Sequence, residues 1–142
     1  MKIHIFYENV NFRIRHWRKV KELIEKVIAK ENKISGDLNF IITTDEILKE
    51  INIKFLNHYY YTDVISFNYD YQNNLAGEVY ISLDSVKINA KNYKVSYNHE
   101  LIRVIIHGVL HICGHDDRTR SERKKMSMLE DFWLNTYENK FK

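Results

Sequence analysis

The chain has 142 residues, of which 44% are hydrophobic, and a formal net charge of +3 at pH 7. This length and composition predict a single domain over residues 1–142 with a substantial hydrophobic core. They exclude a membrane-spanning helix, because no run approaches the roughly 18 apolar residues that a span needs, and the polar start and the single cysteine lead us to expect a cytoplasmic protein.

Strands and amphipathic helices follow one another along the first half of the chain. Alternating apolar residues predict a strand at 3–7, and a helical stripe predicts a helix from Trp17 that ends before a turn at Ser35-Gly36. A second strand is expected at 38–42, and it can lie parallel to the first because a helix connects them. The next helix is expected to begin with a capping box of Thr43 and Glu46, to reach about Leu56 and to bury Ile47, Ile51 and Phe55.

The second half of the chain completes an α+β fold. Strands at 64–67 and 79–81 are expected to pair as an antiparallel hairpin, and a short helix at 84–92 places Val86 and Ala90 on one face. A helix at 97–113 is apolar on most sides, which predicts that it is buried. The last helix is expected to start at Thr119, with Glu122 as its capping partner, and to bury Met126, Leu129, Phe132 or Trp133, and Tyr137. We predict a roughly four-stranded mixed sheet packed with about five helices, with the functional site at the end of the central buried helix.

The segment from His107 to Asp117 carries the strongest functional signal. His107 and His111 lie four residues apart, so on a helix their imidazoles project from one face and can bind one metal ion. Gly114 follows where a helix commonly ends in a left-handed residue. Beyond that turn, His115, Asp116 and Asp117 each carry donor atoms that could supply a third ligand. Three protein ligands leave one position of a tetrahedral zinc site open, which is typical of catalysis.

Neighbouring residues refine this interpretation. Gly108 stands where metalloproteases of the H-E-x-x-H type carry their general base, so such a base would have to come from elsewhere. Cys113 points about 200° round the helix from His111, and we expect it to pack in the core. Glu100 and Arg103 are expected to form an ion pair, with orientation of a ligand as an alternative role for Glu100. The non-functional alternative for the segment is a pair of core histidines held by hydrogen bonds.

The same segment resembles the signature of the YbeY endoribonuclease family, H-G-x-L-H-x-x-G-Y-D-H. The matching residues are His107, Gly108, Leu110, His111, Gly114 and Asp116. The family's third metal ligand is the last histidine of the motif, where this chain has Asp117, and His115 replaces the usual tyrosine. The resemblance implies one Zn²⁺ per chain bound by His107, His111 and Asp117, with His115 as the alternative third ligand and another divalent transition metal as the alternative ion. With an aspartate ligand the site carries a charge of about +1 rather than +2, so the metal-bound water, the expected catalytic group, should be less acidified.

Two more segments resemble the family. Leu56-Asn57 with residues 62–67 is similar to its L-N…T-D-V-L-S-F block, and residues 77–82 are similar to its G-D-I-x-I-S strand. The family carries an arginine that serves the RNA substrate in the stretch that is shortened here to residues 58–61, so that role cannot be carried over. We expect Arg103 and Arg118 to contact the substrate instead, and Asp63, Ser66 and Glu78 to lie in the cleft without an assigned role.

The resemblance implies a zinc-dependent endoribonuclease that cleaves single-stranded RNA in ribosomal RNA maturation, with RNA or the ribosome as its partner. A basic cluster directly after Asp117 would attract phosphates to the metal: Arg118, Arg120, Arg123, Lys124 and Lys125. An earlier basic cluster is expected to be a solvated face: Arg13, Arg15, Arg18, Lys19 and Lys21. The alternatives are a metalloprotease or another metallohydrolase, against which Gly108 argues, and a non-catalytic ribosome-assembly factor in which the metal braces the fold.

Overall fold

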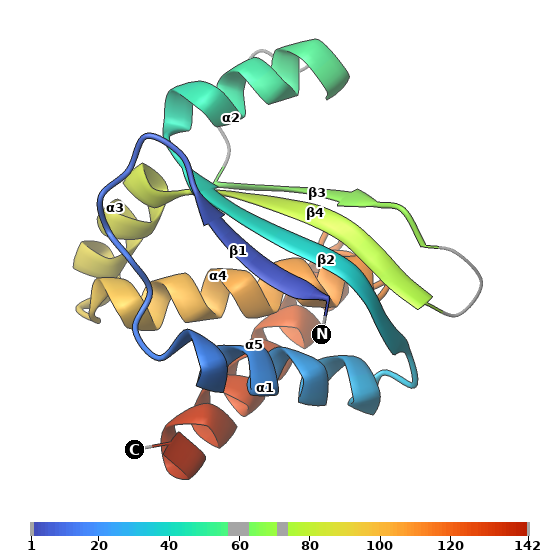
Figure 1. The fold of residues 1–142 in the computed structure, drawn as a ribbon. Coiled ribbons are helices and arrows are strands. Elements are labelled where there is room, and N and C mark those ends of the chain that lie inside the picture. The colour runs from blue at the N-terminus through green and yellow to red at the C-terminus, as the bar shows by residue number, and fades with distance from the viewer. Residues whose placement is uncertain (1, 57–62, 71–73, 142) are drawn as a thin grey trace.

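A computed structural model of the chain describes residues 2–56, 63–70 and 74–141, and its frame is one four-stranded sheet (Figure 1). The strands lie in the order β1-β2-β4-β3, with β3 at one edge. Their bounds are β1 (Ile3–Tyr7), β2 (Ile34–Thr43), β3 (Val64–Asn68) and β4 (Asn74–Ser82). β2 is parallel to both β1 and β4, whereas β3 is antiparallel to β4. The mixed sheet, the parallel first pair of strands and the antiparallel hairpin are therefore confirmed.

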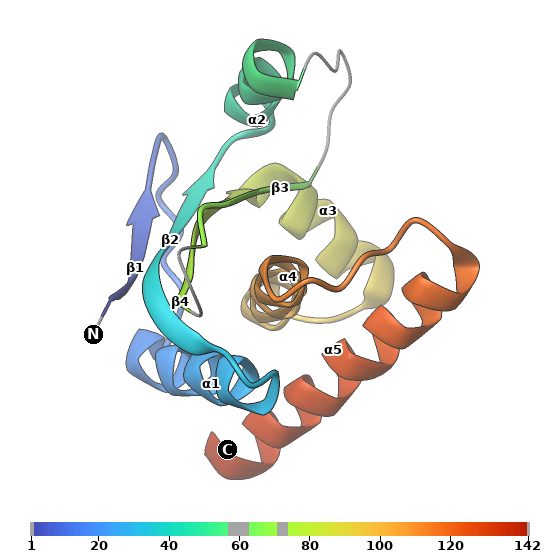
Figure 2. The same ribbon diagram turned by 90° about the vertical axis from the view of Figure 1, so that its right-hand side faces the viewer.

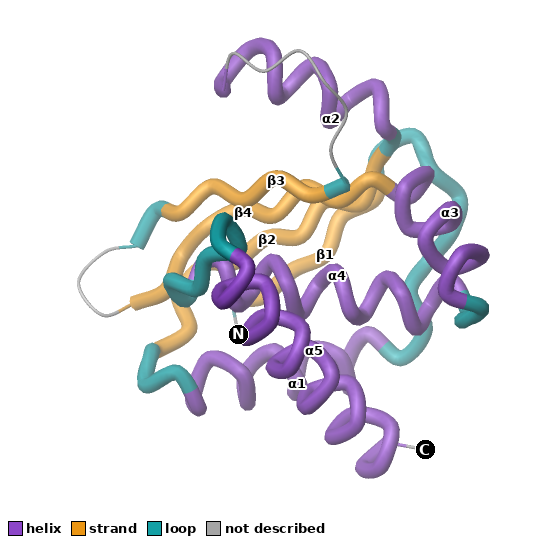
Figure 3. The backbone as a smooth tube through the Cα atoms, turned by 180° about the vertical axis from the view of Figure 1, so that it is seen from behind, coloured by secondary structure: helices purple, strands orange, loops and turns teal. Residues whose placement is uncertain are grey.

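The described residues also form five α-helices, as the sequence predicted. Their bounds are α1 (Trp17–Lys30), α2 (Asp45–Ile51), α3 (Leu83–Tyr93), α4 (Tyr97–Ile112) and α5 (Arg120–Phe141), and a π-helical stretch, η1 (Asn52–Leu56), continues α2. Helix α5 lies across α1 and α4 when the molecule is seen from behind (Figure 3). Within the described part of the chain, no helix combines the length and apolarity that crossing a bilayer requires.

Helix α4 occupies the centre of the molecule. The curved sheet surrounds one side of α4, and α1, α3 and α5 surround the rest (Figure 2). Its side chains explain this position, because ten of its residues are buried, among them Leu101, Ile105 and Val109. A helix that is apolar on nearly all sides is most stable when its neighbours cover it on all sides, because each buried apolar side chain is then removed from water. The predicted burial of this helix is confirmed, and it gives the end of α4 a rigid support.

Several local predictions are also confirmed. Val86 and Ala90 are fully buried on one face of α3. At the start of α5 the backbone N–H of Thr119 donates to Glu122 Oε1, and the N–H of Glu122 donates to Thr119 Oγ1. This is the reciprocal capping box that the sequence indicated. Of the two aromatic candidates for the core, Trp133 is buried and Phe132 is exposed.

The predictions around β2 and α2 need correction. Ser35 and Gly36 belong to β2, and an irregular pairing with β4 replaces the expected turn, because Gly36 approaches the Leu75 carbonyl closely. The cap of α2 is Thr44, whose hydroxyl accepts from the Ile47 N–H, whereas Thr43 lies in β2 and donates to the Glu8 carbonyl. The buried positions of α2 and η1 are Leu48 and Asn52, while Phe55 is 61% exposed. Phe55 meets only the edge of the sheet, where its ring packs edge-on against Phe67 of β3 with the centroids 6.0 Å apart.

Candidate metal centre

The last turn of α4 and the residues that follow it form the site. His107 and His111 project from α4 one turn apart. The helix ends at Ile112, and Gly114 then adopts a φ of 110°, a left-handed value that favours glycine. The backbone N–H of Gly114 donates to the His111 carbonyl, and the N–H of His115 donates to the Leu110 carbonyl. The predicted glycine stop is therefore present, and the reversal returns the chain to the face that carries both histidines.

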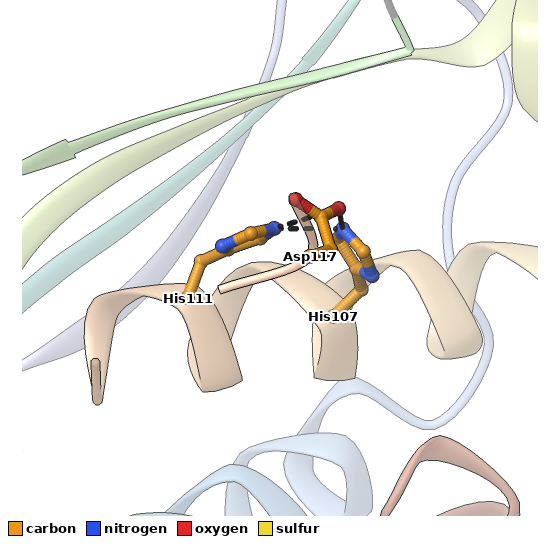
Figure 4. Close-up of side chains that lie close together, drawn as sticks. All are labelled: His107, His111 and Asp117. Atoms are coloured by element: carbon orange, nitrogen blue, oxygen red, sulfur yellow. Dashed lines mark hydrogen bonds and ion pairs between the residues drawn. The ribbon is translucent and has the colours of Figure 1, made fainter. Parts of the chain in front are cut away.

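Asp117 points back at the two histidines (Figure 4). Asp117 Oδ2 lies 3.3 Å from His111 Nε2 and 3.5 Å from His107 Nε2, and the two imidazole nitrogens are 3.0 Å apart. Zinc bonds of about 2.0 to 2.1 Å in a tetrahedron place the donor atoms about 3.3 Å apart. The three separations therefore match the donor triangle of a tetrahedral site, and this donor set suits Zn²⁺ or a similar divalent transition metal.

A pocket of about 410 Å³ opens in front of these donors. Its lining comes from β3 and the residue before it, and from the end of α4 and the turn that follows: Asp63, Val64, Ser66, Asn68, His107, His111, Ile112 and Asp117. Asn68 Nδ2 donates to the Ile112 carbonyl and so joins the strand to the helix end. Two of the three predicted cleft residues, Asp63 and Ser66, lie here. The third, Glu78, lines a separate pocket with Tyr69 and Tyr80, so the structure does not place it beside the histidines.

The far side of His107 rests on a buried ionic network. His107 Nδ1 lies 2.6 Å from Glu130 Oε2 of α5, and Arg103 Nη1 donates to Glu130 Oε1 at 2.7 Å. Arg103 also forms the ion pair with Glu100 that the sequence predicted. Burial raises the pKa of Glu130, but the hydrogen bond and charge of His107, together with Arg103, outweigh it and hold this pKa below its ordinary value. The hydrogen bonds that Arg103 donates to Glu100 are the largest cause of the raised pKa of Arg103.

Glu130 is the neighbour of the site that sequence reasoning missed. A signal was available in the sequence, because Glu130 directly follows Leu129, which was predicted to be buried. A charged residue at such a position usually needs a partner. Glu100 contacts Arg103 and not His107, so its alternative role as a direct partner of a ligand is wrong.

His115 and Cys113 lie away from the three donors. His115 Nε2 is 2.6 Å from Glu31 Oε1 at the end of α1, so this side chain joins the turn to α1. Cys113 packs against the core, as predicted, and burial raises the pKa of its thiol to about 12. The group of possible metal ligands among the described residues is His107, His111 and Asp117.

The two arginines expected to contact substrate differ in their surroundings. Arg103 is held by Glu100 and Glu130 behind His107. Arg118 is exposed and directly follows Asp117. The side chain of Arg123 donates to the Arg118 carbonyl at 2.8 Å, which fixes the backbone of this basic segment at the start of α5. Substrate contact remains a prediction for both residues.

Position 108 has no room for a catalytic side chain. A Cβ atom on Gly108 would lie 2.7 Å from Val79 Cγ1, so the position that holds the base in H-E-x-x-H proteases is closed by the sheet. This packing argues against a protease of that type.

The fold and the site define a small α+β protein with a candidate metal centre at the end of a buried helix. The sequence model of the family described as Endoribonuclease YbeY matches residues 4–138. The chain is 42% identical over 130 residues to the Endoribonuclease YbeY of Christiangramia forsetii, covering 92% of this chain and 90% of that protein. With the Endoribonuclease YbeY of Parabacteroides distasonis it shares 38% identity, and 92% of each chain is covered. The chain belongs to the YbeY family.

A solved structure has the same fold. The solution structure of a protein from Thermotoga maritima matches this fold with a TM-score of 0.66 and 25% sequence identity, and the match covers 98% of this chain and 91% of that one.

Proposed function

We propose that this chain is a zinc-dependent endoribonuclease that cleaves single-stranded RNA in the maturation of ribosomal RNA. The observation that carries the proposal is the convergence of His107, His111 and Asp117 at an open pocket, in a chain whose relatives are named endoribonucleases. Residues 1–142 act as one hydrolase domain, and its partners are RNA and the ribosome.

The three donors hold one divalent cation per chain. A bound Zn²⁺ would supply Lewis acidity and lower the pKa of a water molecule toward about 7. Asp117 supplies the single negative charge among the donors, so the loaded centre keeps a positive charge that attracts a phosphodiester. Other divalent transition metals also accept imidazole and carboxylate ligands, and the identity of the ion is part of the proposal.

The protein surface around the donors suits a polyanion. Ser66 and Asn68 offer polar side chains on the β3 side of the pocket. On the other side, exposed Arg118 begins a segment that is rich in basic residues and contains few acidic ones. Phosphates that this segment attracts would be delivered next to Asp117. The pocket is partly open to solvent, which suits a strand that must enter and leave it.

Two alternatives remain testable beside this proposal. A metalloprotease would use the same donor spacing, although the closed space at Gly108 removes its usual base. A non-catalytic assembly factor would use the metal only to brace the turn after α4. Both predict no cleavage of RNA by the metal-loaded protein.

The test compares substrates with the same metal-loaded protein. Wild type and His111→Ala are incubated with single-stranded RNA, double-stranded RNA and casein, each with and without a chelator. We expect only single-stranded RNA to be cut, cleavage to stop with chelator and return with added Zn²⁺, and His111→Ala to be inactive. Cleavage of casein would favour the protease, and cleavage of neither substrate would leave the assembly factor.

The ends of the cut RNA identify the attacking group. A substrate with a single 2′-deoxy nucleotide at the cut position separates the two routes. If the ribose 2′-hydroxyl attacks, the deoxy substrate resists cleavage and the normal product carries a 2′,3′-cyclic phosphate. If water attacks, both substrates are cut and the products carry simple phosphates.

A further inference from the structure

The carboxylate of Glu130 uses both of its oxygens on residues of α4. Oε2 lies 2.6 Å from His107 Nδ1, within hydrogen-bond distance, and Oε1 accepts from Arg103 Nη1 at 2.7 Å. Glu130 is only 5% exposed. With little water to compete, these charge-assisted bonds fix the geometry of both partners.

The bond to Nδ1 determines which nitrogen of His107 can bind a cation. A neutral imidazole carries one proton, and the carboxylate at Nδ1 holds that proton there. The lone pair is then left on Nε2, the atom that faces His111 Nε2 and Asp117 Oδ2. The same bond fixes the rotation of the ring about its attachment to α4.

Arg103 in turn holds Glu130 in place. Its Nε and Nη2 donate to the two oxygens of Glu100 at 2.9 and 2.6 Å, and Glu100 is 1% exposed. Two buried carboxylates and one partly exposed guanidinium leave one net negative charge in this network. That charge lies behind His107, on the side opposite the pocket.

We propose that Glu130 is the positioning residue of the metal centre. It holds His107 in the tautomer and orientation that bind the cation. The inference rests on the metal site of the proposed function and not on its RNA substrate.

The experiment compares Glu130→Gln with Glu100→Gln. In both variants an amide NH₂ replaces one of two oxygens that accept hydrogen bonds, so each variant loses one charge and one bond of the same network. Only Glu130 reaches His107, which makes Glu100→Gln the matched control. Affinity for Zn²⁺ is measured by competition with a chromophoric chelator, and urea unfolding of the metal-free proteins reports the structural cost of each change.

We expect Glu130→Gln to weaken Zn²⁺ binding by about 10- to 100-fold, the effect usual for loss of a partner behind a ligating histidine. Glu100→Gln should bind Zn²⁺ nearly as tightly as wild type, even where the two variants are destabilised equally. Equal losses of affinity in both variants, or no loss in either, would overturn the proposal. So would a wild-type protein that binds no Zn²⁺.

A second measurement needs no variant. Nitrogen-15 NMR of the metal-free wild type reports which ring nitrogen of His107 carries a proton. We expect the proton on Nδ1, and a proton on Nε2 would contradict the proposal. A protein that binds Zn²⁺ in a Glu130-dependent way yet cuts no RNA would contradict the proposed function and leave this inference standing.

Discussion

A Cβ atom placed on Gly108 would lie 2.7 Å from Cγ1 of Val79, well inside the contact distance of two carbon atoms. Val79 is fully buried in β4, and its branched side chain has little rotational freedom. Helix α4 therefore approaches the sheet at a distance that only glycine allows. Because His107 precedes this contact directly, the close approach also sets how far both histidines stand from β3.

The contact makes Gly108→Ala a test of the packing. Overpacking a core typically costs roughly 1–3 kcal/mol. This cost exceeds the gain of about 1 kcal/mol from replacing glycine by alanine inside a helix. We expect a net loss of about 1 kcal/mol in the free energy of unfolding, measured by urea denaturation of the metal-free protein. In a Val79→Ala background the same change should become neutral or stabilising. An equal loss in both backgrounds would show that the contact with Val79 is not the cause.

The third ligand is tested by Asp117→Ala, with His115→Ala as its control. Asp117 points at both histidines, whereas His115 contacts Glu31. We expect Asp117→Ala to weaken metal binding by more than about 100-fold, because loss of a ligand costs more than loss of a residue that only hydrogen-bonds to a ligand. His115→Ala should keep its metal in elemental analysis after dialysis. Full retention of metal by Asp117→Ala together with loss by His115→Ala would assign the third ligand to His115 instead.

The capping box of α5 predicts a pH dependence that NMR can follow. Hydrogen bonds from the backbone and hydroxyl of Thr119 hold the pKa of Glu122 below its ordinary value. Since the folded-state pKa is the lower one, ionised Glu122 stabilises the helix above the unfolded-state pKa. This stabilisation is lost as the pH falls through the folded-state pKa.

The carboxyl carbon shift of Glu122 should therefore titrate at a lower pH than that of an unpaired glutamate. In Thr119→Val, which removes the hydroxyl and keeps the shape, the midpoint should move upward. An unchanged midpoint would mean that the hydroxyl of Thr119 does not contribute to the shift.

The basic segment after Asp117 predicts a change in the salt dependence of RNA binding. One lost phosphate contact lowers the slope of log K against log salt by about 0.7 for a single strand. We expect this change for Arg118→Ala. Arg18→Ala should leave the slope unchanged, because Arg18 lies on the exposed face of α1 in the other basic cluster. Equal effects of the two variants would show that the attraction is general rather than directed to the metal.

The sequence was sufficient wherever the information was local. The sequence of α4 is apolar on nearly every side of the helix, and this pattern predicted that the helix is buried at the centre of the fold. The spacing of His107 and His111, followed by Gly114, is a local geometric code as well. The reciprocal bonds of Thr119 and Glu122 span three residues and could be read in the same way.

The failures came from contacts between distant segments. Glu130 meets His107 only because α5 crosses α4, and no spacing within either helix indicates that crossing. The irregular pairing at Ser35 and Gly36 depends on the Leu75 backbone of another strand. The burial of α2 and η1 depends on packing against distant strands, so the apolar period alone selected Phe55 wrongly.

The three donor side chains come from eleven consecutive residues, yet distant helices hold this short segment from both sides. Glu130 of α5 secures His107, and Glu31 at the end of α1 secures the turn through His115. A bound ion would thus report on the integrity of the whole tertiary structure. Partial detachment of α5 would separate Glu130 from His107 while the sheet remained intact, so metal binding would weaken before the rest of the fold is lost.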